Sequence, residues 1–374
     1  MKRMQHASSV LAGQTLRVLL RNLAIVGLLT AALLWSLQPG PSFEPAGKPH
    51  GSSSSSSSDS QAPGSNPNLT VTLVVARLRK DDTSWLAREL PSFSTAIYTL
   101  DDNDTAAAGP LAVPANKGHE VMAYLTYIIT HYRALPALSI FLHAHQHAWH
   151  NAELLGRDMA TMLRRLRLGH VVGGGGGGFV NLRCEWEPGC PAWLDLQSDP
   201  EIAFKKEEKA ARASWRELHP ADPRPAVLAQ PCCAQFAVSR ERIRAVPLAE
   251  WERYRAWVVE TSLSDDLAGR VWEYTWQWVL AGTSVLCPSV EACYCENYGV
   301  CFGEGEGEGK GYERWVELRE GKKRVEEQLR EEEKLRAEEE GWGEREELEK
   351  WLELAEAEGK ALVEEAIKRG DEML

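Results

Sequence analysis

The chain has 374 residues, which is enough for one sizeable domain or two small ones. Its formal net charge of −12 is concentrated at the C-terminal end, where residues 304–374 hold 25 acidic and 14 basic residues. The rest of the chain is therefore close to neutral. It has no basic footprint of the kind that binds nucleic acid, so nucleic acid is excluded as an expected partner.

The first 68 residues predict a membrane anchor followed by a tether. Residues 1–21 are basic and predicted to be cytosolic, and residues 22–37 form an apolar run without a charged side chain. Basic residues before such a run keep its N-terminus in the cytosol. Residues 38–68 are rich in proline and serine, which is typical of an extended stem. We expect a single-pass type II membrane protein of the Golgi or endoplasmic reticulum with a lumenal head; a cleaved secretory signal is the alternative.

The cysteine pattern supports a lumenal head. All eight cysteines lie between Cys184 and Cys301, and an even number behind a membrane anchor indicates disulfides. We expect Cys184 to pair with Cys190, and leave the partners of Cys232 and Cys233 open. Further pairing is expected among Cys287, Cys293, Cys295 and Cys301. Zinc is the alternative, although the spacing differs from that of common zinc sites. Sequons at Asn68 and Asn103 are candidate glycosylation sites.

Residues 69–302 predict an α/β head domain, with one mixed or mostly parallel sheet and helices on both faces. The predicted strands are residues 69–77, 96–100, 138–143, 179–182 and 233–238. The predicted helices are residues 81–90, 120–132, 154–168, 248–260 and 267–281, with a further helix that Ser239 caps and Pro247 ends. Six consecutive glycines, residues 173–178, indicate a low-complexity loop insert.

Acidic residues follow the second predicted strand, and ligands of such sheets bind beyond the carboxyl ends of strands. Asp102 and Asp104 have the spacing to hold Mn²⁺ or Mg²⁺ against a diphosphate. A solvated loop is the alternative interpretation.

Residues 116–120 (Asn-Lys-Gly-His-Glu) open the first long predicted helix. Free amides at a helix start favour an anion, so Asn116, Lys117 and Gly118 are candidate phosphate-binding residues. Glu120 is a candidate general base or metal ligand. Alternatively, it is an acid that the helix dipole favours in the first turn.

Four histidines lie within residues 143–150, just past the third predicted strand. If the strand continues, His143, His145 and His147 share one face. Such imidazoles can bind a metal, contact a diphosphate or act as acid and base, and we select His143 and His145 for these roles. Structural hydrogen bonding is the alternative.

Arg270 and Glu273 form an i,i+3 pair on one predicted helix. Beside Trp272 and Trp276 this pair suits a sugar site in which an indole stacks on a pyranose ring. Glu273 is the candidate that orients or deprotonates an acceptor hydroxyl, and Arg270 is the candidate that balances phosphate charge; a local ion pair is the alternative. Arg240, after a buried predicted strand, is a further candidate anion contact.

These stretches also carry a family resemblance. The segments that show the resemblance are residues 116–129, 141–145, 148–151, 180–184, 231–240 and 269–274. Together they resemble the fungal and bacterial family of unknown function DUF3431 across residues 70–302. The Asn-x-Gly-Arg-Glu element of that family is similar to one in polysaccharide-assembly glycosyltransferases, although this chain has His119 in place of the arginine. The resemblance implies a glycosyltransferase-A-like head, but no established activity.

The C-terminal region is a separate charged segment. Residues 303–311 are a Gly/Glu spacer, and residues 312–374 predict one long helix supported by acid-before-base pairs at i,i+4. A partial heptad of apolar residues allows a coiled-coil partner.

Three functions therefore stand as hypotheses. The leading one is transfer of a sugar from a nucleotide-sugar donor to a glycan acceptor. The alternatives are a non-catalytic sugar-binding or scaffold module, and a metal-dependent hydrolase that uses the histidines of residues 143–150. For the first, we expect one cleft at the carboxyl edge of the sheet, formed by Glu120, His143, His145, Arg270 and Glu273.

Overall fold

The computed structural model describes residues 69–101, 111–173, 175–197, 205–303, 310–335 and 343–373. The predicted anchor at residues 22–37, the stem at residues 38–68 and both sequons, Asn68 and Asn103, lie outside the described residues. Among the described residues, no helix combines the length and the apolar character that crossing a membrane requires.

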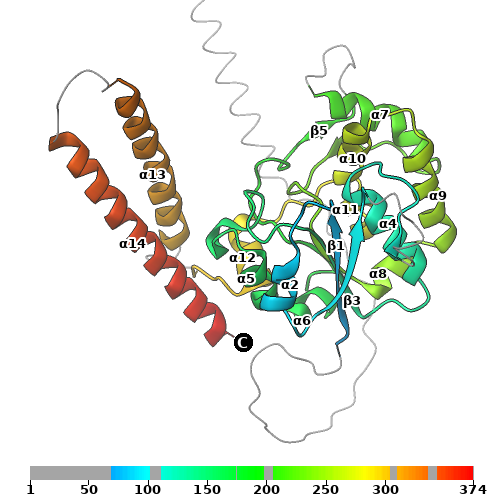
Figure 1. Cartoon of the computed structure of the whole chain (residues 1–374), viewed down its shortest axis with the longest axis horizontal. Coiled ribbons are helices and arrows are strands. Elements are labelled where there is room, and N and C mark those ends of the chain that lie inside the picture. The colour runs from blue at the N-terminus through cyan, green and yellow to red at the C-terminus, as the bar shows by residue number, and fades with distance from the viewer. Residues whose placement is uncertain are drawn as a thin grey trace, which may run out of the picture. The chain divides into compact units, whose positions relative to one another are not determined.

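The head is built on a mixed five-stranded sheet, of which β1 and β3 are labelled in Figure 1. The order of the strands is β2-β1-β3-β7-β4. Its strands are β1 (Val71–Arg77), β2 (Ser94–Thr99), β3 (Leu138–His143), β4 (Phe179–Asn181) and β7 (Phe236–Ser239). β1 pairs in parallel with β2 and β3, whereas β7 is antiparallel to β3 and β4. This confirms the predicted α/β class with a mixed sheet. A second sheet of two short strands, β5 (Leu194–Asp195) and β6 (Val227–Leu228), was not predicted.

Side chains of the strands alternate between two apolar cores, one on each face of the sheet. Val74 and Phe141 belong to one core, and their neighbours Leu73 and Ile140 belong to the other. The first core is covered by α4 (Glu120–His131), α7 (Lys206–Leu218), α8 (Arg240–Ala245), α9 (Leu248–Glu260), α10 (Asp265–Glu273) and α11 (Trp276–Ala281). The second is covered by α2 (Ser84–Glu89), α5 (Met159–Arg165), α6 (Leu168–Val172) and α12 (Val290–Tyr298). Helices therefore cover both faces.

Two predicted helices are each divided. The predicted helix 154–168 is a 3₁₀ turn, η2 (Glu153–Leu155), followed by α5. Gly156 ends the turn in the left-handed region at φ 68°, and Asp158 caps α5 by accepting from Ala160 N and Thr161 N. Likewise, the predicted helix 267–281 is α10 and α11, with a break at residues 274–275. Helices α7 and α12 were not predicted.

The predicted cap of α8 is confirmed, because Ser239 Oγ accepts from Arg242 N at 3.3 Å. The helix ends at Ala245, two residues before Pro247. Arg242 also donates from Nε to the Gly177 carbonyl at 2.5 Å, which connects α8 to the turn formed by the described part of the glycine run.

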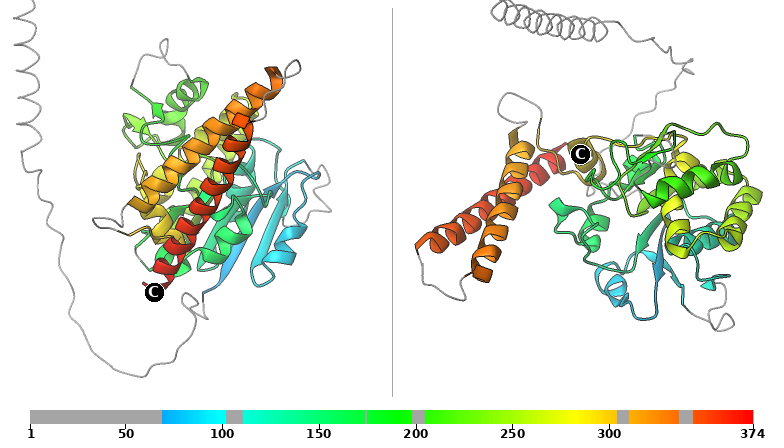
Figure 2. Two further views of the ribbon diagram at one scale, coloured as in Figure 1. Left: turned by 90° about the vertical axis from the view of Figure 1, so that its left-hand side faces the viewer. Right: turned by 90° about the horizontal axis from the view of Figure 1, so that it is seen from above.

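The charged C-terminal region contains two helices rather than one. α13 (Lys310–Leu335) and α14 (Gly343–Glu372) lie side by side (Figure 2). They run antiparallel, since Arg314 Nε lies 2.7 Å from Glu358 Oε1 while Trp351 packs on Gly321. The prediction of one long helix is therefore wrong, because the segment folds back on itself as two helices. The end of α14 also contacts the head, where Cys301 N donates to the Ala366 carbonyl at 3.0 Å.

Four disulfides join all eight cysteines, which confirms the prediction that they are oxidised. The bridges are Cys184–Cys293, Cys190–Cys287, Cys232–Cys233 and Cys295–Cys301. The predicted pair Cys184–Cys190 is wrong, because Cys184 is buried just beyond β4 against α12, which supplies Cys293. The two long-range bridges attach the segment that includes α12 to the segment after β4.

We expect replacement of both long-range bridges, with serine at Cys184, Cys190, Cys287 and Cys293, to lower the free energy of unfolding by about 4–5 kcal/mol, because together they close a long loop. Both bridges have to be removed, since either one keeps the loop closed; the bridged residues are 109 and 97 apart. Urea unfolding under non-reducing conditions measures the change. Cys295→Ser with Cys301→Ser is the control and should cost less, since those residues are only 6 apart. Equal losses in the fourfold variant and the control would contradict the loop-closure argument.

Candidate functional site

A cavity of about 360 Å³ lies at the carboxyl edge of β1 and β3. All five residues predicted to share a cleft line it: Glu120, His143, His145, Arg270 and Glu273. His150, one of the histidines of the hydrolase hypothesis, also lines it. Other lining residues, which were not predicted as site residues, include Arg77, Asp81, Trp149, Cys233 and Asp266. The cavity is within the size range of small-molecule sites.

Strand direction brings these residues together. Because β1 and β3 are parallel, Arg77 at the end of β1 and His143 at the end of β3 reach the same edge. Glu120 is the first residue of α4, whose start lies at that edge because α4 leads into β3. The start of α10 is attached to the start of α4, since Gly118 N and His119 N donate to Asp265 Oδ1 at 2.5 and 3.3 Å.

His143 lies at the centre of the cavity wall. Its Nδ1 is 3.2 Å from His150 Nε2, and its Nε2 is 3.9 Å from Glu120 Oε2. Its backbone N–H donates to Gln235 Oε1 at 3.0 Å, which fixes the end of β3. Burial, and then the neighbouring His150, lower the pKa of His143 from 6.5 to about 3. Burial likewise lowers the pKa of His150 to about 4. Both imidazoles are therefore neutral at physiological pH.

Glu120 is a carboxyl group that favours its proton. Burial, with a smaller contribution from the charge of Glu273, raises the pKa of Glu120 from 4.5 to about 8. Its side chain keeps 18% exposure. A pKa close to neutral allows one group both to accept and to donate a proton, which is the property a general acid or base needs.

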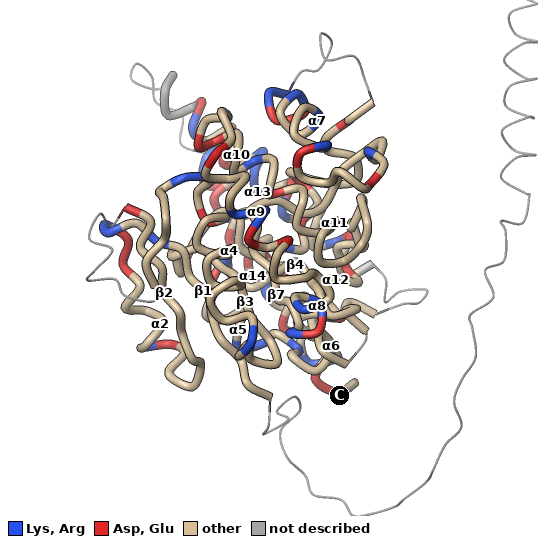
Figure 3. Tube along the Cα trace, turned by 90° about the vertical axis from the view of Figure 1, so that its right-hand side faces the viewer, with Lys and Arg blue, Asp and Glu red and all other residues tan. Residues whose placement is uncertain are grey.

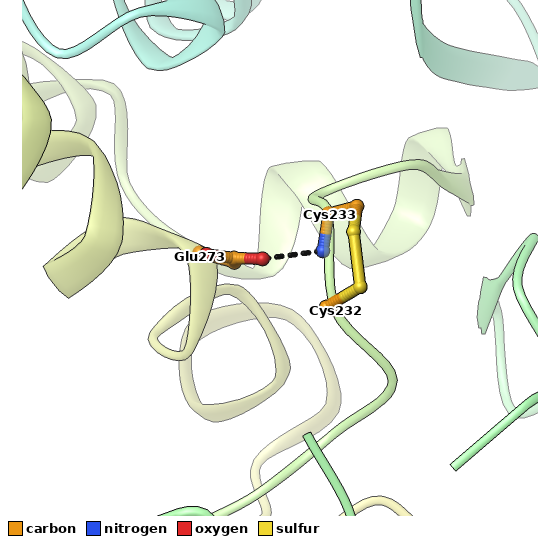
Figure 4. A group of neighbouring side chains, drawn as sticks. All are labelled: Cys232, Cys233 and Glu273. Atoms are coloured by element: carbon orange, nitrogen blue, oxygen red, sulfur yellow. Dashed lines mark hydrogen bonds between the residues drawn. A yellow bond between two sulfur atoms is a disulfide. The ribbon is translucent and has the colours of Figure 1, made fainter. Parts of the chain in front are cut away.

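Glu273 is held on both carboxylate oxygens. Cys233 N donates to Oε1 at 2.5 Å (Figure 4). Arg270 Nη1 donates to Oε2 at 3.0 Å. Burial raises the pKa of Glu273, whereas the Cys233 amide and Arg270 act in the opposite direction. Arg270 is 47% exposed, so its guanidinium also faces solvent. Both oxygens of Glu273 therefore accept hydrogen bonds from within the protein.

Among the described residues, one group has the spacing of metal ligands, namely Cys232, Cys233 and Glu273. The two sulfur atoms are joined in a disulfide (Figure 4), so they are not available as thiolate ligands. Of the predicted metal ligands, Asp102 and Asp104 lie outside the described residues. His145 is directed to Asp81, with Nε2 4.0 Å from Oδ1, rather than to His143.

The predicted phosphate site at the start of α4 has a different arrangement. The amides of Gly118 and His119 are occupied by the Asp265 carboxylate, which takes the place expected for an anion. Lys117 Nζ donates to the Thr261 and Val259 carbonyls at the end of α9. Asn116 is exposed, and neither it nor Lys117 lines the cavity. Gly118 has a structural role, because it adopts φ +76° and a Cβ there would lie 2.8 Å from Val258.

Two further predictions for the site are wrong. Arg240 lies at the opposite edge of the sheet, where its N donates to the carbonyl of Ala137 just before β3. The cause is the antiparallel direction of β7, which ends where β3 begins. Trp272 and Trp276 are fully buried and pack on each other, with ring centroids 4.8 Å apart, so neither can stack on a sugar.

The tryptophan that does line the cavity is Trp149, whose exposure is 60%. Trp149 and His150 both belong to the histidine-rich segment, residues 143–150. The sequence prediction placed His147, rather than His150, on the same face as His143. The strand ends at His143, and the chain then turns so that His150 meets His143. The presence of His150 in the same histidine-rich segment was the only sequence signal for this contact. The alternation of side chains along a strand does not predict it, because the two histidines are seven residues apart and the strand ends at the first.

Residues 73–296 match the family described as Protein of unknown function (DUF3431), and the chain belongs to this family. No curated protein and no solved structure matches the chain.

We expect Glu120→Gln to flatten the pH dependence of stability. The folded protein binds the Glu120 proton more tightly than the unfolded chain, so its stability contribution is complete below pH 4.5 and is lost as the pH rises through about 8. The limiting slope is about 1.4 kcal/mol per pH unit. Urea unfolding at about pH 5 and about pH 9 should show a smaller decline in the variant than in wild type.

Glu241→Gln is the matched control for this measurement, because its side chain is 69% exposed on α8. Its decline should follow that of wild type. An equal decline in Glu120→Gln and wild type would show that the pKa of Glu120 is not raised.

Proposed function

We propose that the chain is a glycosyltransferase-like enzyme that moves a sugar from a nucleotide-sugar donor to a hydroxyl group of a glycan acceptor. The observation that supports this proposal is the Glu120 carboxyl group at the cavity edge, with a pKa raised by burial to about 8, beside the neutral imidazole of His143. A proton acceptor of this kind is what activation of a sugar hydroxyl requires.

In the proposed reaction, the acceptor oxygen forms a bond to the anomeric carbon as the bond from that carbon to the donor phosphate breaks. The carboxylate form of Glu120 accepts the proton of the acceptor hydroxyl. His143 Nε2 orients the hydroxyl by a hydrogen bond, because this buried atom has no partner within the described structure. Arg270, half exposed at the rim, faces the negative charge that develops on the leaving phosphate.

The carboxyl groups that line the cavity outnumber the guanidinium groups. Asp81, Glu120, Asp266 and Glu273 accompany Arg77 and Arg270. A nucleoside diphosphate therefore needs a divalent cation here, and we infer Mn²⁺ or Mg²⁺, with Asp102 and Asp104 as the predicted ligands. The metal-dependent hydrolase alternative has weaker support, since the described residues offer no other group with metal-ligand spacing than Cys232, Cys233 and Glu273.

The proposed setting is the secretory lumen, with the head tethered by the predicted anchor at residues 22–37. Four disulfides in the head favour an oxidising compartment. Basic and acidic residues are interspersed over α7, α9 and α10 rather than separated by sign (Figure 3), which fits a glycan partner better than a nucleic acid.

We expect the purified full chain to release a nucleoside diphosphate from at least one nucleotide-sugar in the presence of Mn²⁺ or Mg²⁺. The rate should rise with pH up to about 8, because Glu120 accepts a proton only when ionised. Glu120→Gln should lower the rate by about 10²–10³-fold. Glu241→Gln should leave it unchanged. Turnover that survives Glu120→Gln, or absence of turnover with every nucleotide-sugar, would contradict the proposed activity.

The topology has its own test. In sealed microsomes, we expect the head to resist added protease. After the microsomes are opened with detergent, we expect an endoglycosidase to increase the gel mobility of the chain through removal of glycans at Asn68 or Asn103. Digestion of the head in intact vesicles would place it in the cytosol and contradict the type II orientation.

A further inference from the structure

Trp149 is the one tryptophan of the described head that is mostly exposed, at 60%. By contrast, Trp251, Trp272 and Trp276 are completely buried. An indole left in water forgoes the burial that stabilises the other tryptophans. This indole is also part of the cavity wall. An exposed aromatic ring in a polar cavity is a feature of ligand sites.

Buried groups hold Trp149 in place. Arg183 is only 6% exposed, and its Nη1 donates to the Trp149 carbonyl at 3.3 Å. The same guanidinium lies 5.4 Å from the centroid of the indole, a cation–π contact. Arg183 is itself fixed, because Nη2 donates to the Glu187 carbonyl at 2.7 Å. On another side, the ring of His150 meets the indole edge-on, with centroids 5.5 Å apart. The position of the ring is therefore set before any ligand binds.

The same cavity contains a buried polar atom without a hydrogen-bond partner among the described residues. His143 Nε2 is buried without a hydrogen-bond partner within the described residues, and it faces Glu120 at 3.9 Å. As a neutral imidazole, His143 can donate or accept a hydrogen bond. His143 Nε2 and the indole of Trp149 line the same cavity. Together they suit a pyranose, which has hydroxyl groups along its edge and carbon–hydrogen bonds on its face.

We propose that Trp149 is the stacking surface of a subsite for a neutral pyranose, the acceptor sugar of the transfer reaction, and that Arg183 is its positioning residue. The assignment of this sugar as the acceptor rests on the proposed transferase function. Stacking of a sugar on Trp149 does not require that the protein be an enzyme. Even with Glu120 protonated, the lining carboxyl groups of Asp81, Asp266 and Glu273 outnumber the two lining guanidinium groups, which favours a neutral, hydroxyl-bearing ring over the phosphates of the donor. Hydroxyl groups donate to carboxylates, whereas phosphate oxygens are repelled by them.

The test is binding of neutral di- and trisaccharides of glucose, mannose and galactose to the purified full chain, measured by calorimetry. Wild type should bind at least one of them, and Trp149→Ala should weaken binding at least about tenfold. Trp149→Phe, which keeps an aromatic ring, should lose less. Trp351→Ala removes an indole of α14 outside the cavity and should leave sugar binding unchanged. Because Trp149 is exposed, Trp149→Ala should keep the wild-type melting temperature.

Donor turnover without acceptor, measured on the same proteins, separates this inference from the proposed function. If donor is hydrolysed while Trp149→Ala binds saccharides like wild type, the subsite is wrong and the transferase proposal stands. If no donor is turned over but Trp149→Ala loses saccharide binding, the subsite stands and the protein is a sugar-binding module. If Trp149→Ala loses nucleotide binding but keeps saccharide binding, Trp149 stacks on a base and the subsite is wrong. If wild type binds none of the saccharides, the subsite is also wrong.

Discussion

The direction of the strands is the constraint on which the candidate site depends. β1 and β3 run parallel, so that Arg77 and His143 reach one edge of the sheet, and the helix between β2 and β3 begins at that edge with Glu120. β7 runs the other way, which removes Arg240 from the site but places the segment before this strand, with Cys233, at the cavity. One reversal of direction thus decides which polar residues share a cavity.

Contacts between distant segments then fix the side chains. The Cys233 amide and Arg270 hold the Glu273 carboxylate, and Asp265 binds the two amides before Glu120. Cys232 and Cys233 form their own disulfide, and φ at Cys233 is +83°. These contacts turn the Cys233 N–H toward Glu273 and keep α10 against the start of α4. Glu120 is the carboxyl group of the cavity whose pKa burial raises to about 8.

The sequence was a good guide to what local patterns control. Residues 138–143 and 248–260 are a strand and a helix with the predicted bounds. The first is a short apolar run that follows Pro136, and the second follows Pro247 and has its apolar residues at helical spacing. That Glu120, His143 and His145 line one cavity agrees with the prediction from parallel strands, whereas Arg270 and Glu273, which also line it, were selected from their helix alone.

What failed depended on contacts that no local pattern encodes. Cys184 pairs 109 residues away, and the amides near Gly118 are occupied by an acid 147 residues away. Tryptophan spacing on a helix cannot distinguish a core from a sugar site, so Trp272 was overvalued and Trp149 overlooked. The hairpin of α13 and α14 was missed because of the weak apolar seam of this charged region. Such a seam does not show whether the helix packs on another part of the same chain or on a second chain.

If the cavity lined by residues of β1, β3, α4 and α10 is the ligand site, a crystal structure of the full chain with a non-hydrolysable nucleotide-sugar, a neutral disaccharide and Mn²⁺ will show both ligands there. We expect a sugar ring over Trp149, with a hydroxyl group within hydrogen-bonding distance of Glu120 and His143. Both ligands bound elsewhere, with this cavity filled by water alone, would contradict it.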